Sequence, residues 1–195
     1  MRIENREHWL NLILPFIQER FKAAGYEVPQ NLRFTCGFPS KGALGAKKRR
    51  IGECWDSGAS SDKVFEISVS PTLDDPIKVV GVQIHEVVHA VVGLKVGHKK
   101  PFAKCAEAVG LTKPWTATGE SDELKEAIKG WVDRVGPYPH GALKPRHKEQ
   151  GEKGRMLLMQ CKCGLKVRTT QKWIDAYGES WPCPCAGELV AAEQE

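Results

Sequence analysis

Apolar residues in the N-terminal third of the chain follow first a helical and then a strand-like spacing. Residues 6–24, "REHWLNLILPFIQERFKAA", place apolar side chains at helical intervals, and Gly25 with Pro29 beyond it marks the end of this helix. Three short apolar segments follow, "NLRFTCGF", "RRIGECW" and "KVFEISVS". The last alternates most regularly, and "DSGASSD" before it has the composition of a turn. This pattern predicts one helix followed by a small antiparallel sheet.

A continuous apolar stretch in the middle of the chain predicts a buried helix. The segment "DDPIKVVGVQIHEVVHAVVGL" has Asp75 as a capping residue and Pro76 at the first helical position. Its apolar residues cover nearly every face, which is typical of a helix in the centre of a domain. Two shorter helices are predicted in "KPFAKCAEAVG" and in "SDELKEAIKGWVDRVGP", the second capped by Ser121.

The composition changes after the last of these helices. Residues 136–155, "GPYPHGALKPRHKEQGEKGR", are rich in Pro, Gly and charge, which is typical of a linker. We therefore predict a first domain over residues 1–140, a linker over 141–155 and a small module over 156–190. The expected fold class is α+β, with an N-terminal helix, a small antiparallel sheet and a buried central helix, plus the C-terminal module.

The composition of the chain and its number of cysteines indicate the cellular compartment of the protein. The chain has 195 residues and seven cysteines, an odd number that fits poorly with a secreted disulfide framework. The apolar run Leu10–Ile17 is short and contains Pro15, so we interpret it as part of a helix and not as a signal peptide. Residues 79–96 are long enough to suggest a membrane span, but their histidines, glutamate and lysine argue against one. We predict a cytoplasmic protein.

The central helix carries the motif H-E-x-x-H. His85 and His89 are four residues apart, so both can direct ring nitrogens at one metal ion from the same helix face. Glu86 lies about 100° round the helix and can act as a general base for an attacking water. The motif is typical of zinc metalloproteases, although short motifs also occur by chance in core helices.

A catalytic zinc needs a third protein ligand and an open fourth position. His98 is the first choice, because Gly93 and Gly97 allow the chain to turn back over the helix. Glu107 is the alternative, since a carboxylate can also complete such a site.

Four of the seven cysteines are clustered in the C-terminal module. Cys161, Cys163, Cys183 and Cys185 form two C-x-C pairs. Four thiolates on one ion make a closed, structural zinc site, which can supply the folding energy that so small a module lacks. Two disulfides are the alternative. The other three, Cys36, Cys54 and Cys105, are expected to be small buried residues.

Positive charge is concentrated around the linker and the cysteine module. The net charge is +5, and residues 144–172 contain nine Lys and Arg against two Glu. Basic segments beside Trp173, Trp181 and Tyr177 suit a nucleic-acid backbone with unpaired bases, although a solvated linker is the alternative. The predicted DNA contacts are Lys144, Arg146, Lys166, Arg168, Lys172 and Trp173. A second basic cluster is "KKRR" at 47–50.

The order of these features resembles the SprT-like zinc metallopeptidases, which include the Spartan proteases. The resemblance rests on "RRIGECW…KVFEISVS" before the active helix, on "HEVVHA", on "GHKKPF" and on the C-terminal segment opened by "CKC". It implies a zincin-like core, zinc held by His85, His89 and His98, Glu86 as the catalytic acid, and a zinc ribbon. It also implies action on proteins bound to DNA.

Two functions of different classes follow from these observations. The first is a zinc endopeptidase, with one catalytic and one structural zinc, a protein substrate and DNA as partner; Tyr138 or His140 can assist if their loop returns to the cleft. The second is a DNA-binding or transcription-associated zinc protein without turnover. The presence of Glu86 favours the first, because a structural site needs no base.

Overall fold

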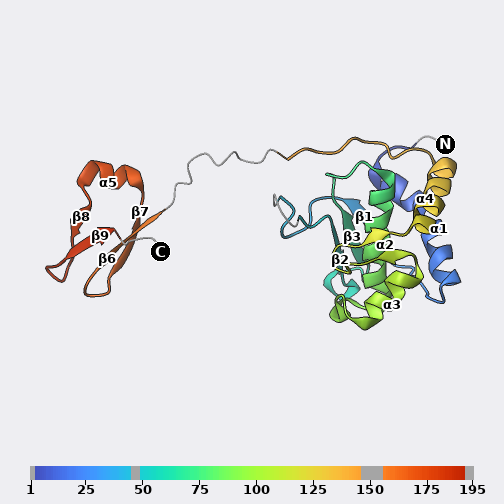
Figure 1. Ribbon diagram of the computed structural model, residues 1–195, viewed down its shortest axis with the longest axis horizontal. Helices are drawn as coiled ribbons and strands as arrows, with labels where there is room; N and C mark the ends of the chain where they lie inside the picture. The colour runs from blue at the N-terminus through green and yellow to red at the C-terminus, as the bar shows by residue number, and fades with distance from the viewer. Residues whose placement is uncertain (1–2, 45–48, 146–155, 192–195) are drawn as a thin grey trace. The chain divides into compact units, whose positions relative to one another are not determined.

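The chain divides into two compact units in the computed structural model, residues 1–147 and residues 148–195 (Figure 1). The structure describes residues 3–44, 49–145 and 156–191. Most of the predicted linker, residues 146–155, lies outside the described residues, as do Lys47 and Lys48 of the second basic cluster.

The first unit is built from four helices and five strands in the described residues. They are α1 (Arg6–Ala23), β1 (Leu32–Cys36), β2 (Gly52–Trp55), β3 (Phe65–Val69), α2 (Pro76–Val92), α3 (Lys100–Ala108), β4 (Leu111–Thr112), β5 (Gly119–Glu120) and α4 (Asp122–Val135), with short 3-10 turns at Ser57–Ala59 and Leu94–Val96. All four predicted helices are confirmed to within about two residues at each end. The predicted caps are also present: Asp75 accepts from the Ile77 N–H at 3.0 Å, and Ser121 from the Leu124 N–H at 3.2 Å.

The main sheet has the order β1-β3-β2 and is mixed. Strands β2 and β3 form the expected antiparallel hairpin, with Cys54 opposite Ile67. Strand β1 runs parallel to β3, with Phe34 opposite Ile67, so the prediction of an all-antiparallel sheet was wrong. The physical reason is that alternation fixes which side chains are buried but does not fix the direction of a strand joined by a long connection. The edge position of β2 places that strand beside α2.

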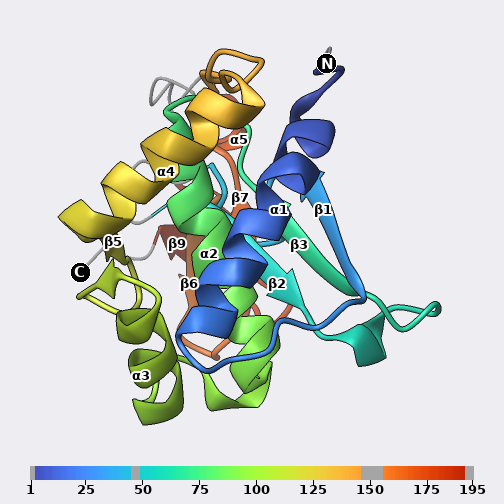
Figure 2. The ribbon, with the colours of Figure 1, turned by 90° about the vertical axis from the view of Figure 1, so that its right-hand side faces the viewer.

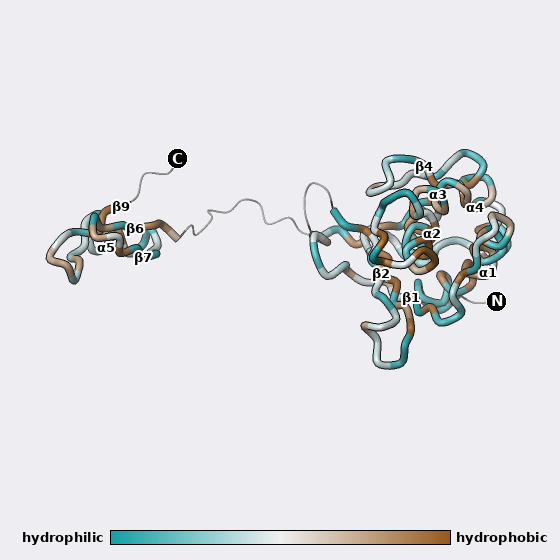
Figure 3. Tube along the Cα trace, turned by 90° about the horizontal axis from the view of Figure 1, so that it is seen from below, coloured by the Kyte–Doolittle hydropathy of each residue, from teal (hydrophilic) through white to brown (hydrophobic). Residues whose placement is uncertain are grey.

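Helix α2 is the centre of the first unit. Helices α1 and α2 lie against the sheet, and α4 packs on both of them (Figure 2). Val79, Val80, Ile84, Val87 and Val88 are fully buried. Figure 3 shows α2 among the most hydrophobic parts of the trace. The buried helix expected from the apolar pattern is confirmed, and it carries the histidines into the interior of the unit.

The second unit is a four-stranded antiparallel sheet with one short helix. Its elements are β6 (Leu157–Cys161), β7 (Lys166–Thr169), α5 (Gln171–Tyr177), β8 (Ser180–Pro182) and β9 (Glu188–Ala191), and the sheet order is β7-β6-β9-β8. Its buried apolar cluster is small and includes Met159, Ile174 and Leu189 together with Cys161 and Cys183. A core of this size leaves the unit dependent on another source of folding energy. Within the described part of the chain, no helix is long and apolar enough to cross a membrane.

Candidate metal centres

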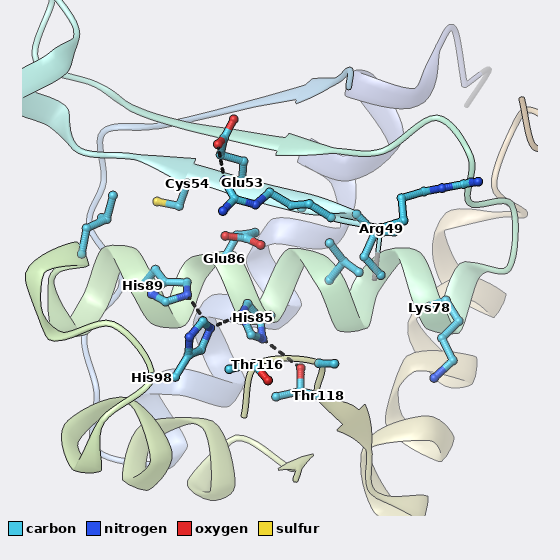
Figure 4. A pocket seen from close by; sticks show the side chains of 16 residues that line it. Arg49, Glu53, Cys54, Lys78, His85, Glu86, His89, His98, Thr116 and Thr118 are labelled. Atoms are coloured by element: carbon cyan, nitrogen blue, oxygen red, sulfur yellow. Dashed lines mark hydrogen bonds and ion pairs between the residues drawn. The ribbon is translucent and has the colours of Figure 1, made fainter. Parts of the chain in front are cut away.

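The three histidines of the first unit reach one point from two segments. His85 and His89 stand one turn apart on α2. The helix ends at Gly93, which has φ +86°, and the following 3-10 turn ends at Gly97, which has φ +56°. These left-handed conformations favour glycine, and they turn the chain so that His98 returns over the helix (Figure 4). The sequence prediction that His98 approaches His85 and His89 is confirmed.

The spacing of the ring nitrogens fits a tetrahedral metal. His98 Nε2 lies 3.2 Å from His85 Nε2 and 3.2 Å from His89 Nε2. Three nitrogens bound to zinc at the usual 2.0–2.1 Å, in tetrahedral geometry, are about 3.3 Å apart. The three histidines can therefore hold one metal ion in the arrangement that they already have. Among the described residues no carboxylate oxygen joins this group, and Glu107 is exposed on α3, so the structure does not support Glu107 as third ligand.

The surroundings keep these imidazoles neutral. Burial, followed by the neighbouring His89 and His98, lowers the pKa of His85 to about 3. Burial and His98 lower the pKa of His89 to about 4, and burial lowers the pKa of His98. A neutral imidazole has a free nitrogen lone pair, which is the form that ligates a metal.

The ring of Phe102 forms the floor of the histidine cluster. Its centroid lies 5.0 Å from that of His85, 4.6 Å from that of His89 and 4.8 Å from that of His98. Phe102 is fully buried on α3. This apolar ring excludes water from one side of the cluster. The histidines are therefore accessible from the cavity that they line.

Glu86 lies on the adjacent face of α2, against strand β2. The residue is only 7% exposed. A Cβ at Gly52 would lie 2.4 Å from Glu86 Oε1 and 2.6 Å from Val82 Cγ1, so the glycine is what allows β2 to approach the carboxylate. Burial raises the pKa of Glu86 to about 8, and the positive charge of Arg50 opposes part of this rise. A carboxyl group in this state can both take and return a proton near neutral pH.

A cavity of about 510 Å³ opens between β2 and the segment before β5. Figure 4 shows His85, Glu86 and His89 from α2 beneath it, with Cys54 and Glu53 on the β2 side and Thr116 and Thr118 on the other. Arg50 also lines the cavity and is held by Glu53, with Nη1 2.7 Å from Oε1. The cavity is therefore flanked by residues from three segments that are far apart in the sequence.

Several of these cavity residues were not found by sequence reasoning. Gly52, Cys54 and Thr118 lie outside the H-E-x-x-H motif, and only tertiary contacts bring them to it. Their residue types carry no signal of their own, except that a glycine within a strand pattern can mark a close approach of another element.

The loop that carries Tyr138 and His140 does not return to the cavity, so the condition for their assistance is not met. Tyr138 is buried on Trp9, with ring centroids 5.0 Å apart, and its hydroxyl lies 3.8 Å from Cys36 Sγ. Neither Tyr138 nor His140 lines the cavity. The reason is that the chain after α4 folds back along α1, where Trp9 Nε1 donates to the Gly136 carbonyl oxygen at 2.9 Å.

The four clustered cysteines of the second unit form a second candidate centre. Cys161 Sγ lies 3.5 Å from Cys185 Sγ, Cys163 Sγ lies 3.6 Å from Cys183 Sγ, and Cys183 and Cys185 are 3.4 Å apart. All of them are free thiols, so the disulfide alternative is not supported. Four sulfurs at 2.3 Å from a tetrahedral zinc are about 3.8 Å apart, close to the spacing seen. The sulfur set fits one metal ion.

Local backbone features support this sulfur set. A Cβ at Gly187 would lie 3.1 Å from Cys161 Sγ and 3.2 Å from Cys185 Sγ, so this position has little room for a side chain. The backbone N–H of Leu165, followed by the neighbouring thiols, lowers the pKa of Cys163 to about 7. A metal ion would favour the thiolate form further.

The three remaining cysteines differ from one another. Cys105 is fully buried, as predicted. Cys36 is half-buried and contacts Tyr138. Cys54 lines the cavity, and burial, with the neighbouring Glu86, raises its pKa to about 12. The thiol of Cys54 is therefore neutral beside the candidate base.

The predicted DNA contacts lie in both units. Lys166, Arg168 and Lys172 are exposed on the second unit, and Trp173 is 46% exposed. Trp173 stacks on Tyr177 with centroids 5.7 Å apart, and Lys172 Nζ lies 5.4 Å from the Trp173 ring centroid. Lys144 is exposed near the end of the first unit, and Arg146 lies outside the described residues. The second unit thus places cations beside an exposed aromatic pair.

Comparison of the chain with protein-family models, with curated proteins and with solved structures found no match.

Proposed function

We propose that this protein is a zinc-dependent endopeptidase of the SprT-like type, with a zincin-like core, that acts on DNA-associated proteins. The observation that carries the proposal is the convergence of three neutral imidazoles beside a buried carboxylate, within one open cavity. A structural site made by His85, His89 and His98 has no use for a carboxylate with a raised pKa at its side. A hydrolase needs such a group as a base.

Each residue of the site has a separate task in peptide hydrolysis. Zinc, when bound by the three histidines, polarises the scissile carbonyl and makes water a stronger acid. Glu86 takes a proton from the attacking water and returns it to the nitrogen of the leaving amine. Because Gly52 brings β2 close to Glu86, the carboxylate is held in place and shielded from bulk water.

Strand β2 offers a place for the substrate backbone. It is one of the two edge strands of the sheet, and its residues from Gly52 to Cys54 line the cavity. An edge strand has unpaired N–H and C=O groups, to which an extended peptide can add as a further strand. A peptide bound in this way passes over Glu86 and the histidines. Its main chain makes the contacts, so binding does not require particular side chains.

Proteolysis is expected to depend on the ion held by the histidines. We expect the full chain to cleave a purified DNA-binding protein, to lose this activity after treatment with a zinc chelator, and to regain it with added zinc. The His85→Ala/His89→Ala variant should stay inactive after zinc is restored, because two of three ligands are gone. Cleavage is followed by gel electrophoresis, with and without DNA.

Two results would contradict the endopeptidase proposal. One is cleavage that survives chelation, which would place the activity elsewhere. The other is the absence of cleavage in protein whose histidine site holds zinc; this result would favour a DNA-binding zinc protein without turnover.

DNA binding is expected to follow the exposed cations and the aromatic pair of the second unit. With Lys166, Arg168 and Lys172 on phosphates, affinity should fall linearly with salt on a log–log plot, largely independently of sequence. Lys166→Ala with Arg168→Ala should reduce the slope by roughly 1.4–1.8, and Trp173→Ala should weaken binding to single strands by about 1–3 kcal/mol. Fluorescence anisotropy at several salt concentrations measures both quantities.

A matched control for this experiment lies on α4. Lys125 and Lys129 are paired with Asp122 and Glu126, and replacing both with Ala should leave the salt slope unchanged. Deleting residues 144–195 should abolish binding and leave the histidine site intact. Equal binding by the truncated chain would move the DNA contacts to the cluster at 47–50, and no binding at low salt would leave a peptidase without a nucleic-acid partner.

A further inference from the structure

The short hairpin of β4 and β5 lies across the helix that carries the histidines. Leu111 pairs with Glu120, and Thr112 pairs with Gly119. Between the two strands, the Ala117 N–H donates to the Pro114 carbonyl oxygen at 2.9 Å and closes a turn. The end of this hairpin is thus a defined structure, and it forms one side of the cavity.

Glu120 fixes the hairpin on α2. The residue is 6% exposed, and its carboxylate forms an ion pair with Lys78. A Cβ at Gly81 would lie only 2.1 Å from Glu120 Oε1, so the carboxylate occupies the place where a side chain at this helix position would be. Lys78 and Gly81 are three residues apart on α2 and share one face. The pair and the glycine together set how closely the hairpin approaches the helix.

The same helix face carries His85, four residues beyond Gly81. On the hairpin, Thr118 precedes Glu120 by two residues, so both side chains are directed to the same side of the strand. Thr118 Oγ1 lies 2.9 Å from His85 Nδ1, as the dashed line in Figure 4 shows. Glu120 on Gly81 and Thr118 on His85 are therefore two successive contacts between one strand and one helix face.

The contact with Nδ1 bears on how His85 can act as a ligand. A neutral imidazole carries one proton, and the ring ligates through the nitrogen that lacks it. The Nε2 atom of His85 faces His98 at 3.2 Å, so the proton must be on Nδ1 when Nε2 binds an ion. The hydroxyl oxygen of Thr118 can accept the hydrogen bond from that Nδ1–H.

We infer that Thr118 is the positioning residue for His85: its hydroxyl accepts from Nδ1–H and holds the ring in the tautomer and orientation that present Nε2 to the metal. Thr118 acts through His85 and does not itself touch the ion or the substrate. Glu120, seated on Gly81 and paired with Lys78, sets its position. The inference rests on the proposed histidine metal site, and it adds a residue from outside the motif to that site.

Zinc affinity of the histidine site tests this role without any activity assay. Thr118→Val keeps the shape of the side chain and removes the hydroxyl, and Thr118→Ser keeps the hydroxyl. We expect zinc affinity of the full chain, measured by competition with a chelator after the cysteine site is filled, to fall about 10–100-fold in the valine variant. The serine variant should recover most of the affinity. Thr112→Val, at an exposed position of the same hairpin, is the matched control and should bind as the wild type does.

The tautomer of His85 gives a second readout. In 15N NMR spectra of the protein with the histidine site free of metal, the wild-type and serine proteins should show the Nδ1–H form of His85. The valine variant should show a mixture of the two tautomers. If valine at this position disturbs the fold, as judged by the amide spectrum, Thr118→Ala provides the same comparison.

The outcomes separate this inference from the proposed function. Unchanged zinc affinity and an unchanged His85 tautomer in the Thr118→Val protein would overturn the role of Thr118. Zinc binding that is unaffected in His85→Ala would instead remove the histidine site itself, and with it the basis of the peptidase proposal.

Discussion

Glu86→Gln is expected to keep zinc in the histidine site and to lose proteolysis by about 10²–10⁴-fold, or more, because one residue serves both proton transfers. The amide has the size of the carboxyl group, so it fits beside Gly52 without displacing β2. It cannot take a proton from water at neutral pH. The measurement is kcat/KM for cleavage of the DNA-binding protein, together with the zinc content of each preparation.

The same substitution should change how the stability of the metal-free protein depends on pH. The pKa of Glu86 is raised from the ordinary 4.5 to about 8 by burial. A raised pKa in the folded state means that the folded protein holds a proton which the unfolded chain has already released. The contribution of Glu86 to the free energy of unfolding is therefore fully present below about pH 4.5. It is lost as the pH rises to about 8. In the Glu86→Gln variant the free energy of unfolding should not fall over this pH range. Denaturant titration of the metal-free proteins at several pH values measures this difference.

Glu107→Gln is the matched control for Glu86→Gln. Glu107 is an exposed carboxylate on α3 and is not part of the histidine group, so its replacement should leave both zinc content and cleavage at wild-type levels. Full activity in Glu86→Gln would show that the base lies elsewhere. Loss of zinc in the Glu107→Gln protein would show that Glu107 is a metal ligand, which the position of His98 beside the other two histidines does not predict.

The local part of the site could be predicted from the sequence because its spacing is a property of one helix. His85 and His89 share a face of α2 by their four-residue separation, and the apolar pattern around them indicates burial. His98 could be inferred as well, since two glycines in a short segment allow the chain to return. In each case the relevant residues lie within one helix or one short turn of the motif.

The rest of the site depends on contacts between distant segments. Gly52 and Glu86 are more than thirty residues apart in the sequence and lie close together in the fold. The same is true of Thr118 and His85. A strand pattern shows which side chains face the core, but it does not show which helix residue each of them meets. For the same reason the parallel direction of β1 could not be read from its alternation.

The cysteine module shows a similar limit. Two C-x-C pairs near each other indicate a metal site, and the four sulfurs do come together. Which sulfurs of the two pairs face each other is a property of the fold: Cys161 is beside Cys185, and Cys163 is beside Cys183. This crossed arrangement follows from the antiparallel pairing of β6 with β9, which places Cys161 opposite Leu189 and brings the turn that carries Cys185 next to it.

Replacing Cys183 and Cys185 with Ser is expected to unfold the second unit and to release one zinc ion per chain. The apolar cluster around Met159, Ile174 and Leu189 is small, and a fold confined to residues 156–191 falls below the size of about 40 residues at which domains usually need metal, disulfides or partners to fold. Structural zinc supplies apparent binding energies of about 10–16 kcal/mol in comparable modules, so loss of two ligands removes most of the folding energy of the unit. The 15N amide spectrum should lose the dispersed signals of residues 156–191.

The first unit should be unaffected by this double substitution. It has its own buried core and its own group of candidate metal ligands, so the histidine site should keep its ion, and elemental analysis should fall from two zinc ions to one. Cys36→Ser is the matched control: this thiol belongs to neither group, and a hydroxyl can keep the contact with Tyr138. Two zinc ions and a fully dispersed spectrum in the Cys183→Ser/Cys185→Ser protein would mean that the second unit folds without the sulfur site. One ion lost from the histidines instead would mean that the two centres are coupled, contrary to their separate ligand sets.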